Sequence, residues 1–430
     1  MPPSSRQLEV ELLRHTFGGS SMGRLPDGRA VFVPYALPGE RVWVELIEEK
    51  RGFARARLVE VLKASPQRII PRCRHFGVCG GCHYQHLPYA EQLQVKSEVL
   101  REQLERIGGI GAPPLEAIQP SPQEWHYRNT VQFHLDERGR LGYEAMGSNQ
   151  VVAIEECFLP QPPLDEIWRQ LDFEAGLGIE RVGLRVGLDE EVLLTLEGQA
   201  TELPALEVDL PISAVHLSPA GSLVLAGEDW LPMEVNGRPF RVSAESFFQI
   251  NTAQAGAMVE YLQEALPLDQ QTTLLDVYCG VGLFSAFLAE RVARCIGVEV
   301  SPSACEDYAV NLDEYDHVEL YMGAAEEVLP GLRLSGRLVV VLDPPRAGLD
   351  RRALDALVAL QPEWIAYVSC DPATLARDLK RLVEQGYRLE RIKPFDLFPQ
   401  TYHIESISLL QRANQGNRRR ALTSATASGR

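Results

Sequence analysis

The strongest constraint on the fold lies in the carboxyl-terminal half of the chain, where short apolar segments alternate with stretches of helical periodicity. Four such segments follow residue 240, and they read LLDVYCG, ARCIGVEV, LVVVLDPP and WIAYVSC. Buried strands separated by amphipathic helices are the pattern of βαβ units, which build a mostly parallel, doubly wound sheet. The sequence therefore predicts an α/β domain in this half of the chain.

The first of these segments ends in a glycine-rich turn, and the second ends in a carboxylate. Gly280 and Gly282 lie in the turn, and Glu299 closes the next strand. Ligands of doubly wound sheets bind across the carboxyl ends of the strands, where glycine admits close backbone contact and a carboxylate can bind a ribose. A dinucleotide site would place a third glycine where Ser285 stands. The pattern favours S-adenosylmethionine over a nicotinamide cofactor.

Three polar residues at later strand ends are candidates for chemistry. Asp343 begins a rigid Asp-Pro-Pro loop, which would place a polar group over the reactive end of the cofactor. Cys370 follows a strand and precedes a helix, a setting that lowers the pKa of a thiol, although an apolar-flanked cysteine is more often an inert core thiol. Glu405 stands with His403 at the start of the final strand, where it is either a general base or a surface carboxylate.

A cysteine-rich segment lies much earlier in the chain. Cys73, Cys79 and Cys82 form a C-x5-C-x2-C arrangement, and Cys157 is the nearest of the other cysteines. Thiolates separated by glycines can bend around one metal centre, and in a cytoplasmic protein such a set favours metal binding over disulfides. Both an iron–sulfur cluster and zinc suit the spacing, because histidines of the same segment could complete a zinc site. Those histidines are His75, His83 and His86.

The amino-terminal residues alternate apolar and polar side chains between turns, which predicts a small β-barrel. The formal net charge of the chain is −17, but the charge is uneven. Residues 1–72 carry 12 basic and 8 acidic side chains, whereas residues 161–240 carry 4 and 15. Basic residues interleaved through a barrel suit either RNA binding or a solvated surface. The net charge therefore does not exclude a polyanion as partner.

The chain divides into four parts. We predict a barrel over residues 1–62, a strand-rich central domain over 63–237, the α/β domain over 238–412 and a disordered tail over 413–430. No apolar run approaches the roughly 18 residues of a membrane helix, and the first residues lack a secretory pattern. We expect a cytoplasmic protein with no membrane partner and no obligate protein partner.

Nearly the whole chain resembles one family, the class I S-adenosylmethionine-dependent RNA uracil-5-methyltransferases of the iron–sulfur 23S rRNA type, which carry an amino-terminal TRAM domain. The matching segments include GGSSMGRLPDGRAVFVPYALPGERV, PRCRHFGVCGGCHYQHLPY, WHYRN, SFFQIN, LLDVYCGVGLFS, VLDPPRAGL, VSCDPATLARDL and HIES. The resemblance implies a Rossmann-like methyltransferase sheet, an OB-like TRAM barrel and an iron–sulfur central domain. In this family the helix expected at 89–108 can pack on the methyltransferase domain.

The resemblance also implies two cofactors and the residues that hold them. A [4Fe-4S] cluster would be held by Cys73, Cys79, Cys82 and Cys157. S-adenosylmethionine would be contacted by Gln249, Tyr278 and Glu299, with Asp343 beside the methyl donor and the target base. One cofactor contact of some relatives does not carry over, because Leu283 stands where they have asparagine.

The implied reaction forms 5-methyluridine in RNA, with 23S rRNA as the expected substrate. Cys370 would add to C6 of uracil as the nucleophile, and Glu405 would remove the C5 proton. The alternatives are a tRNA uracil-5-methyltransferase of the same mechanism and a non-catalytic RNA-binding protein. A dehydrogenase is disfavoured because the third glycine of the turn is missing.

Overall fold

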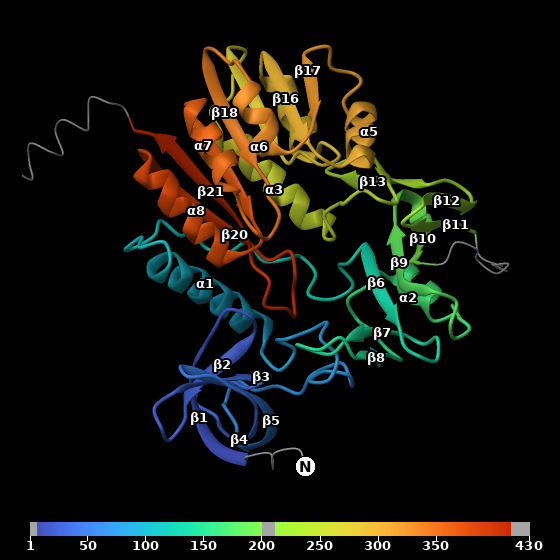
Figure 1. Ribbon diagram of the computed structural model, residues 1–430, viewed down its shortest axis with the longest axis vertical. Helices are drawn as coiled ribbons and strands as arrows, with labels where there is room; N and C mark the ends of the chain where they lie inside the picture. The colour runs from blue at the N-terminus through green and yellow to red at the C-terminus, as the bar shows by residue number, and fades with distance from the viewer. Residues whose placement is uncertain (1–6, 200–210, 414–430) are drawn as a thin grey trace, which may run out of the picture.

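The computed structural model describes residues 7–199 and 211–413 as a closed barrel, two seven-stranded sheets and a two-stranded sheet (Figure 1). In Figure 1 the barrel lies at the bottom, one large sheet at the top and the other at the right. The tail expected over residues 413–430 lies, apart from Ala413, outside the described residues. Within 7–199 and 211–413, no helix combines the length and apolar character that a membrane crossing requires.

Five strands close the amino-terminal barrel in the order β1-β2-β3-β5-β4. They are β1 (Gln7–His15), β2 (Ser20–Arg24), β3 (Ala30–Pro34), β4 (Arg41–Glu49) and β5 (Phe53–Lys63). Alternate side chains of β3 and β4 fill the interior, where Val31, Val33, Val42 and Val44 are fully buried. This burial at every second residue confirms the small barrel predicted from the alternating sequence.

The central sheet has seven strands in the order β12-β11-β10-β9-β6-β7-β8, which confirms a strand-rich middle region. They are β6 (Thr130–Leu135), β7 (Leu141–Glu144), β8 (Val151–Ala153), β9 (Ile179–Val186), β10 (Val192–Gly198), β11 (Ile212–Ser218) and β12 (Gly221–Ala226). The short helix α2 (Pro162–Trp168) contributes Leu164 and Trp168 to the core of this sheet, which also contains Phe133 and Cys157.

The hairpin of β13 (Trp230–Val235) and β14 (Arg238–Ser243) precedes the third large assembly, a sheet in the order β17-β16-β15-β18-β19-β21-β20. Its strands are β15 (Thr272–Val277), β16 (Arg294–Glu299), β17 (Val318–Met322), β18 (Arg337–Leu342), β19 (Trp364–Ser369), β20 (Tyr387–Phe395) and β21 (Glu405–Arg412). Its helices are α3 (Thr252–Ala265), α4 (Leu283–Leu288), α5 (Pro302–Asn311), α6 (Ala325–Val328), α7 (Arg351–Ala359) and α8 (Pro372–Glu384).

This sheet is covered on both faces. Val339 and Val341 of β18 pack with α3 and α4 on one side, whereas Val340 and Leu342 pack with α7 and α8 on the other. The strands β15 to β19 pair in parallel, and β21 runs antiparallel to both of its neighbours. The doubly wound, mostly parallel sheet predicted from the sequence is therefore confirmed.

Helix α1 (Tyr89–Arg106) packs on the last sheet, although the central sheet follows it in the chain. Leu100 and Leu104 share an apolar cluster with Leu379 of α8. The ammonium of Lys96, fully buried, lies 2.5 Å from Asp396. Removing one partner of such a buried pair typically costs about 3–5 kcal/mol, because the other charge is left buried and unpaired.

Candidate active site

Strand register brings Cys370 and Glu405 together at the carboxyl edge of the last sheet. Cys370 directly follows β19, and Glu405 is the first residue of β21. Because the two strands are antiparallel, with Ser369 paired to Ser406, the residue after β19 lies opposite the first residue of β21. A residue at the start of β21 thus reaches the same edge as residues at the ends of the parallel strands.

Asp343 joins this pair as a second carboxyl group. It directly follows β18, the neighbour of β19, and its backbone N–H donates to the carbonyl of Val277 at 3.2 Å. Burial, and then the nearby Asp276, raise the pKa of Asp343 to about 7. Burial, followed by Asp343, raises the pKa of Glu405 well above its usual value. Two carboxyl groups beside each other in a weakly solvated site raise each other's pKa, because like charges repel there.

The structure corrects the sequence-based expectation for the thiol of Cys370. The helix that follows was expected to lower its pKa, whereas burial first, and then Glu405 and Asp343, raise it to about 12. The amino terminus of α8 is also occupied, since the carboxylate of Asp371 accepts hydrogen bonds from Ala373 and Thr374, both at 2.9 Å. Burial of the thiol, with the two nearby carboxyl groups, therefore outweighs any effect of the helix dipole.

A glycine-rich turn and a carboxylate form a cradle at the ends of β15 and β16. The backbone N–H of Gly280 donates to Glu299 at 2.9 Å, and Tyr278 and Gly280 have left-handed backbones with φ of 65° and 53°. A Cβ added at Gly280 would meet no atom within 4 Å, so open space lies above this turn. The carboxylate, the exposed backbone and the open space fit a nucleoside with ribose hydroxyls.

Gln249, which was predicted to contact the cofactor, lies in a segment that precedes the methyltransferase sheet. It lies buried between β14 and α3, and its carbonyl accepts a hydrogen bond from the amide of Asn129 at 2.9 Å. Asp276, within β15, is fully buried and accepts from both the backbone and the hydroxyl of Ser285. Burial raises the pKa of Asp276 to about 6.

The four predicted cysteine ligands meet around one cavity of about 220 Å³. Cys73, Cys79 and Cys82 come from the segment before α1, and Cys157 comes from the loop between β8 and α2. Burial is the main cause that raises the pKa of each thiol, and neighbouring thiols of the same set raise it further in Cys79, Cys82 and Cys157. Among residues 7–199 and 211–413, no three His, Cys, Asp or Glu side chains lie close enough to hold a single metal ion.

Glycines shape the loop that carries these thiols. The backbone N–H of Gly81 donates to the sulfur of Cys79 at 3.4 Å. The N–H of Gly80 donates to the carbonyl of Glu144 at 3.0 Å, and a Cβ at Gly80 would lie 2.6 Å from that oxygen. A set of four thiols in one cavity, with an N–H directed at sulfur, is a suitable donor set for an iron–sulfur cluster.

Two family models match the chain, the tRNA (uracil-5-)-methyltransferase family over residues 227–413 and the TRAM domain over residues 6–59. An RNA methyltransferase of Streptomyces avermitilis is 33% identical, in a match that covers 95% of this chain and 99% of that protein. Another from Aquifex aeolicus is 37% identical, covering 94% and 99%. The chain belongs to the TRAM-containing RNA uracil-5-methyltransferase family.

As a member of this family, the protein is an S-adenosylmethionine-dependent RNA methyltransferase, and not a non-catalytic RNA-binding protein. A solved structure supports the fold. The tRNA (uracil-54, C5)-methyltransferase of Pyrococcus abyssi, in complex with S-adenosyl-L-homocysteine, superposes with a TM-score of 0.72 at 26% identity. The match covers 93% of this chain and 99% of that one, so barrel, central sheet and methyltransferase sheet are all included.

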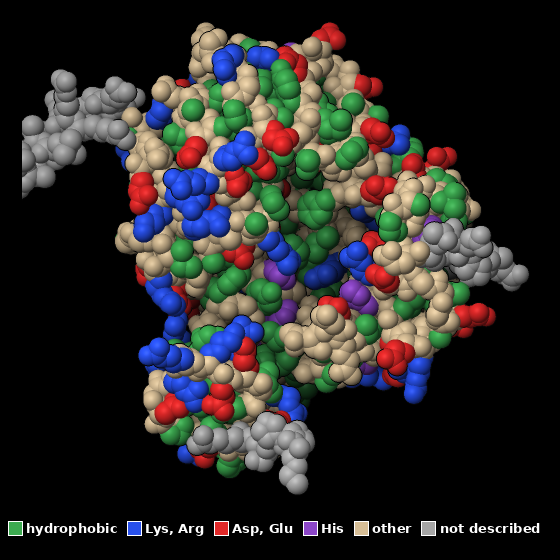
Figure 2. Space-filling view, in the orientation of Figure 1, with side chains coloured by type: hydrophobic (Ala, Val, Ile, Leu, Met, Phe, Trp, Pro, Cys, Tyr) green, Lys and Arg blue, Asp and Glu red, His purple; other side chains and the backbone are tan. Residues whose placement is uncertain are grey.

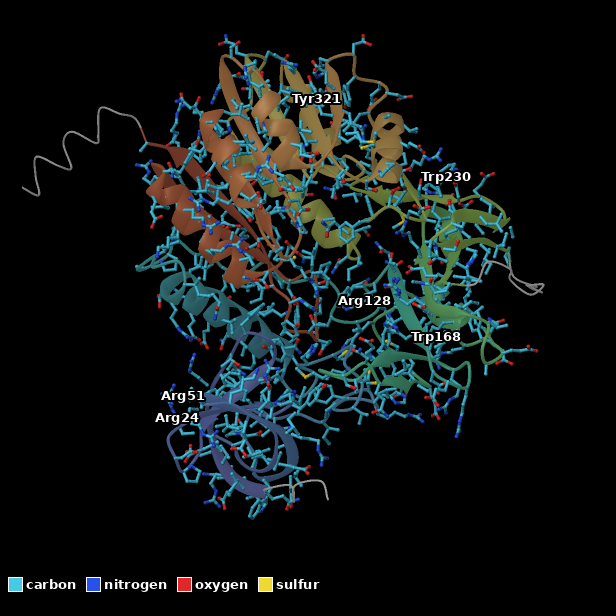
Figure 3. The ribbon with its side chains drawn as sticks, in the orientation of Figure 1. Arg24, Arg51, Arg128, Trp168, Trp230 and Tyr321 are labelled. Atoms are coloured by element: carbon cyan, nitrogen blue, oxygen red, sulfur yellow. The ribbon has the colours of Figure 1, made fainter. Side chains whose placement is uncertain are left out.

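The structure of this RNA methyltransferase also reveals site residues that the sequence did not single out. Figure 2 shows a hollow between the methyltransferase sheet and the other two parts, with Lys or Arg and His side chains inside it. Arg128 points into this central region in Figure 3, and it lines the cysteine cavity together with His403. Arg346 lowers the pKa of both Cys370 and Glu405. Nothing in sequence spacing distinguishes these two arginines from surface arginines.

Proposed function

We propose that this RNA methyltransferase forms 5-methyluridine through a covalent bond between Cys370 and C6 of the target uracil. The observation that carries the proposal is the pairing of Ser369 with Ser406, because it sets Cys370 beside Glu405 at the edge where cofactors of such sheets bind. A nucleophile and a proton acceptor on one base are what C5 methylation requires.

The mechanism follows from the electronics of uracil. C5 is a weak nucleophile until a group adds to C6, and addition of the Cys370 sulfur there places electron density on C5. S-adenosylmethionine, when bound, supplies the methyl group as an electrophile. Glu405 then takes the proton from C5, the bond between the Cys370 sulfur and C6 breaks, and the uracil ring is restored. Access to C6 requires an unstacked uridine, so the target base is flipped out of its helix or loop.

The raised pKa values are consistent with these roles. A thiol with a pKa of about 12 is protonated at neutral pH, so Cys370 must pass its proton to a neighbour as it attacks. In this proposal the carboxylate of Asp343, whose pKa is about 7, takes the thiol proton, which leaves Glu405 free to accept the proton from C5. Burial and Asp343 raise the pKa of Glu405, which makes its carboxylate a stronger proton acceptor than a solvated glutamate. We assign Glu405 as the base that removes the C5 proton.

We assign the cradle to the methyl donor. In this proposal Glu299 binds the ribose, Tyr278 and Gln249 contact the cofactor, and Asp343 lies beside the methyl group and the target base. The proposal is supported by the open space above Gly280, and by the orientation of Glu299 toward that turn.

We further propose that Cys73, Cys79, Cys82 and Cys157 hold a [4Fe-4S] cluster. The shared cavity of about 220 Å³ supports this, because all four cysteines line it and thiolates are the ligands that would hold such a cluster. Iron and acid-labile sulfide should be found in anaerobically purified protein. Stoichiometric zinc without sulfide would contradict the cluster.

The expected substrate is 23S rRNA, because the chain resembles the 23S rRNA type of this family, in which a TRAM domain and a cysteine set occur together. In this proposal RNA meets the barrel, whose Arg24 and Arg51 are labelled in Figure 3, as well as the catalytic edge. A tRNA substrate is the second candidate. It is favoured by the Pyrococcus abyssi enzyme, which acts on uracil 54 of tRNA and matches almost the full length of this chain.

Release of tritium from uridine labelled at C5 tests the reaction and the substrate together. The protein is incubated with S-adenosylmethionine and either labelled 23S rRNA or labelled total tRNA. Release from rRNA supports the proposal, and release from tRNA alone supports the second candidate. Methyl transfer to RNA without tritium release would contradict C5 chemistry, because the C5 hydrogen must leave when a methyl group replaces it.

A further inference from the structure

The segment that leads into Glu405 is fixed by donors from several distant parts of the chain. The carbonyls of four consecutive residues, 397–400, each accept a hydrogen bond from outside the strands of the methyltransferase sheet. The donors are the amide of Asn251 to Leu397, the ammonium of Lys96 to Phe398, the hydroxyl of Tyr127 to Pro399, and the backbone N–H groups of His83 and Tyr84 to Gln400.

Gln400 receives the largest share of these contacts. Its carbonyl accepts from the N–H of His83 at 2.8 Å and of Tyr84 at 3.0 Å, directly after Cys82. Its side-chain oxygen accepts from the amide of Gln92 at 2.9 Å, and its own N–H donates to the side-chain oxygen of Gln92 at 3.0 Å. Both glutamines are buried, so water cannot replace these hydrogen bonds.

The backbone of Gln400 is left-handed, with φ of 68°. Residues with a Cβ rarely adopt this conformation, and they keep it where the surrounding contacts outweigh the local preference. The paired amides and the two backbone donors are such contacts. These contacts stabilise a left-handed turn at Gln400 that the isolated segment would rarely adopt.

The turn is connected to Glu405 through a short, rigid path. The hydroxyl of Thr401 donates to Phe398 at 2.8 Å and accepts from the N–H of His403 at 3.3 Å. The ring of Tyr402 lies 4.5 Å from that of His83 and 4.4 Å from that of His403. The segment therefore has little freedom to move between Gln400 and the start of β21.

We propose that Gln400 is a positioning residue, which together with Gln92 couples the cysteine-bearing segment to the carboxylate of Glu405. The inference rests on the proposed function, because it assumes that Glu405 removes the C5 proton. Gln400 itself does not contact the base. It sets the turn from which β21 begins, and a shift of that turn moves the carboxylate relative to C5.

The test compares Gln92→Ala with Gln94→Ala, an exposed glutamine on the same helix. Gln400→Gly serves as a second variant, because glycine adopts a positive φ freely and keeps the turn while losing the side-chain bond to Gln92. For each variant we would measure kcat, the KM for S-adenosylmethionine, iron content, melting temperature and the kinetic isotope effect with RNA deuterated at uridine C5.

We expect Gln92→Ala and Gln400→Gly to lower kcat about tenfold, to leave the KM for S-adenosylmethionine within about twofold, and to enlarge the isotope effect, since proton removal becomes rate-limiting. Gln94→Ala should match the unmodified protein. A lower melting temperature with an unchanged isotope effect would show a merely structural role and overturn the inference, as would unchanged kcat. Failure of the unmodified protein to release the C5 hydrogen would instead contradict the proposed function.

Discussion

The molecule holds two sets of partly or fully buried thiols whose surroundings differ in charge. Cys370 at the catalytic edge faces the carboxyl groups of Glu405 and Asp343, and these raise its pKa beyond the effect of burial. The four thiols of the cysteine cavity face one another, and Arg128 lowers the pKa of three of them, Cys79, Cys82 and Cys157. Burial alone therefore does not distinguish a nucleophile from a metal ligand.

The difference lies in what each set needs in order to lose its protons. A lone thiol among carboxyl groups can ionise when a neighbour accepts its proton. This suits a nucleophile whose bond to the substrate forms and breaks in every turnover. Four clustered thiols repel one another when ionised, and a cationic metal centre removes that penalty. Cys370 is therefore suited to transient ionisation, and the four thiols of the cysteine cavity are suited to permanent binding of a metal centre.

The largest effect is expected from Cys370→Ala. Loss of the nucleophile should reduce methyl transfer by more than about 10³-fold, because no other group can activate C5. Binding of S-adenosylmethionine, measured by calorimetry, should persist. Cys295→Ala, which alters a buried thiol inside β16, is the control and should retain turnover. Residual activity of a tenth or more in Cys370→Ala would contradict the covalent mechanism.

The cysteine cavity is tested by Gly80→Ala. The added Cβ would lie 2.6 Å from the Glu144 carbonyl, and overpacking of this kind costs about 1–3 kcal/mol. We expect reduced iron content after anaerobic purification. Gly81→Ala is the adjacent control, since its Cβ would meet the Cys79 sulfur at an ordinary 3.5 Å. Equal iron content in the two variants would remove the proposed link between loop geometry and ligation.

The smallest effect concerns the charge at the catalytic edge. Arg346 lowers the pKa of Cys370 and Glu405, so Arg346→Gln should raise both. Glu405 can accept a proton only in its ionised form, and this form disappears as pH falls through the pKa. A raised pKa should therefore move the acidic limb of the profile of kcat against pH to higher pH. We expect about half a pH unit, because solvent screens an exposed charge. Arg351→Gln in α7 is the control, and a shift to lower pH would contradict the assignment.

The sequence predicted the parts of the methyltransferase sheet that are buried. The apolar runs of β15, β16, β18 and β19 were recognisable because both faces of these strands are covered. The edge strand β17 was not singled out, since most of its side chains are partly or fully exposed and it lacks that apolar run. A strand can therefore be predicted from the sequence more readily when more of its side chains are buried.

The resemblance implied that Cys370 and Glu405 act on the same base, but the local sequence pattern predicted the wrong direction for the pKa of the thiol. Local position indicated a helix dipole, whereas the pKa is raised first by burial in the folded protein and then by Glu405 and Asp343, which are not local to the helix end. The same limit applies to Gln400, whose importance lies in contacts with Gln92 and His83. Contacts between segments far apart in sequence leave no periodic signal within either one.

The most direct test of the covalent mechanism uses Glu405→Gln. This variant keeps the nucleophile but cannot accept the C5 proton, so the methylated intermediate should stay bound to the enzyme. After incubation with RNA and S-adenosylmethionine, a denaturing gel should show a stable enzyme–RNA adduct, and the added change Cys370→Ala should abolish it. Free RNA alone in the Glu405→Gln lane, with S-adenosylmethionine bound, would contradict the account.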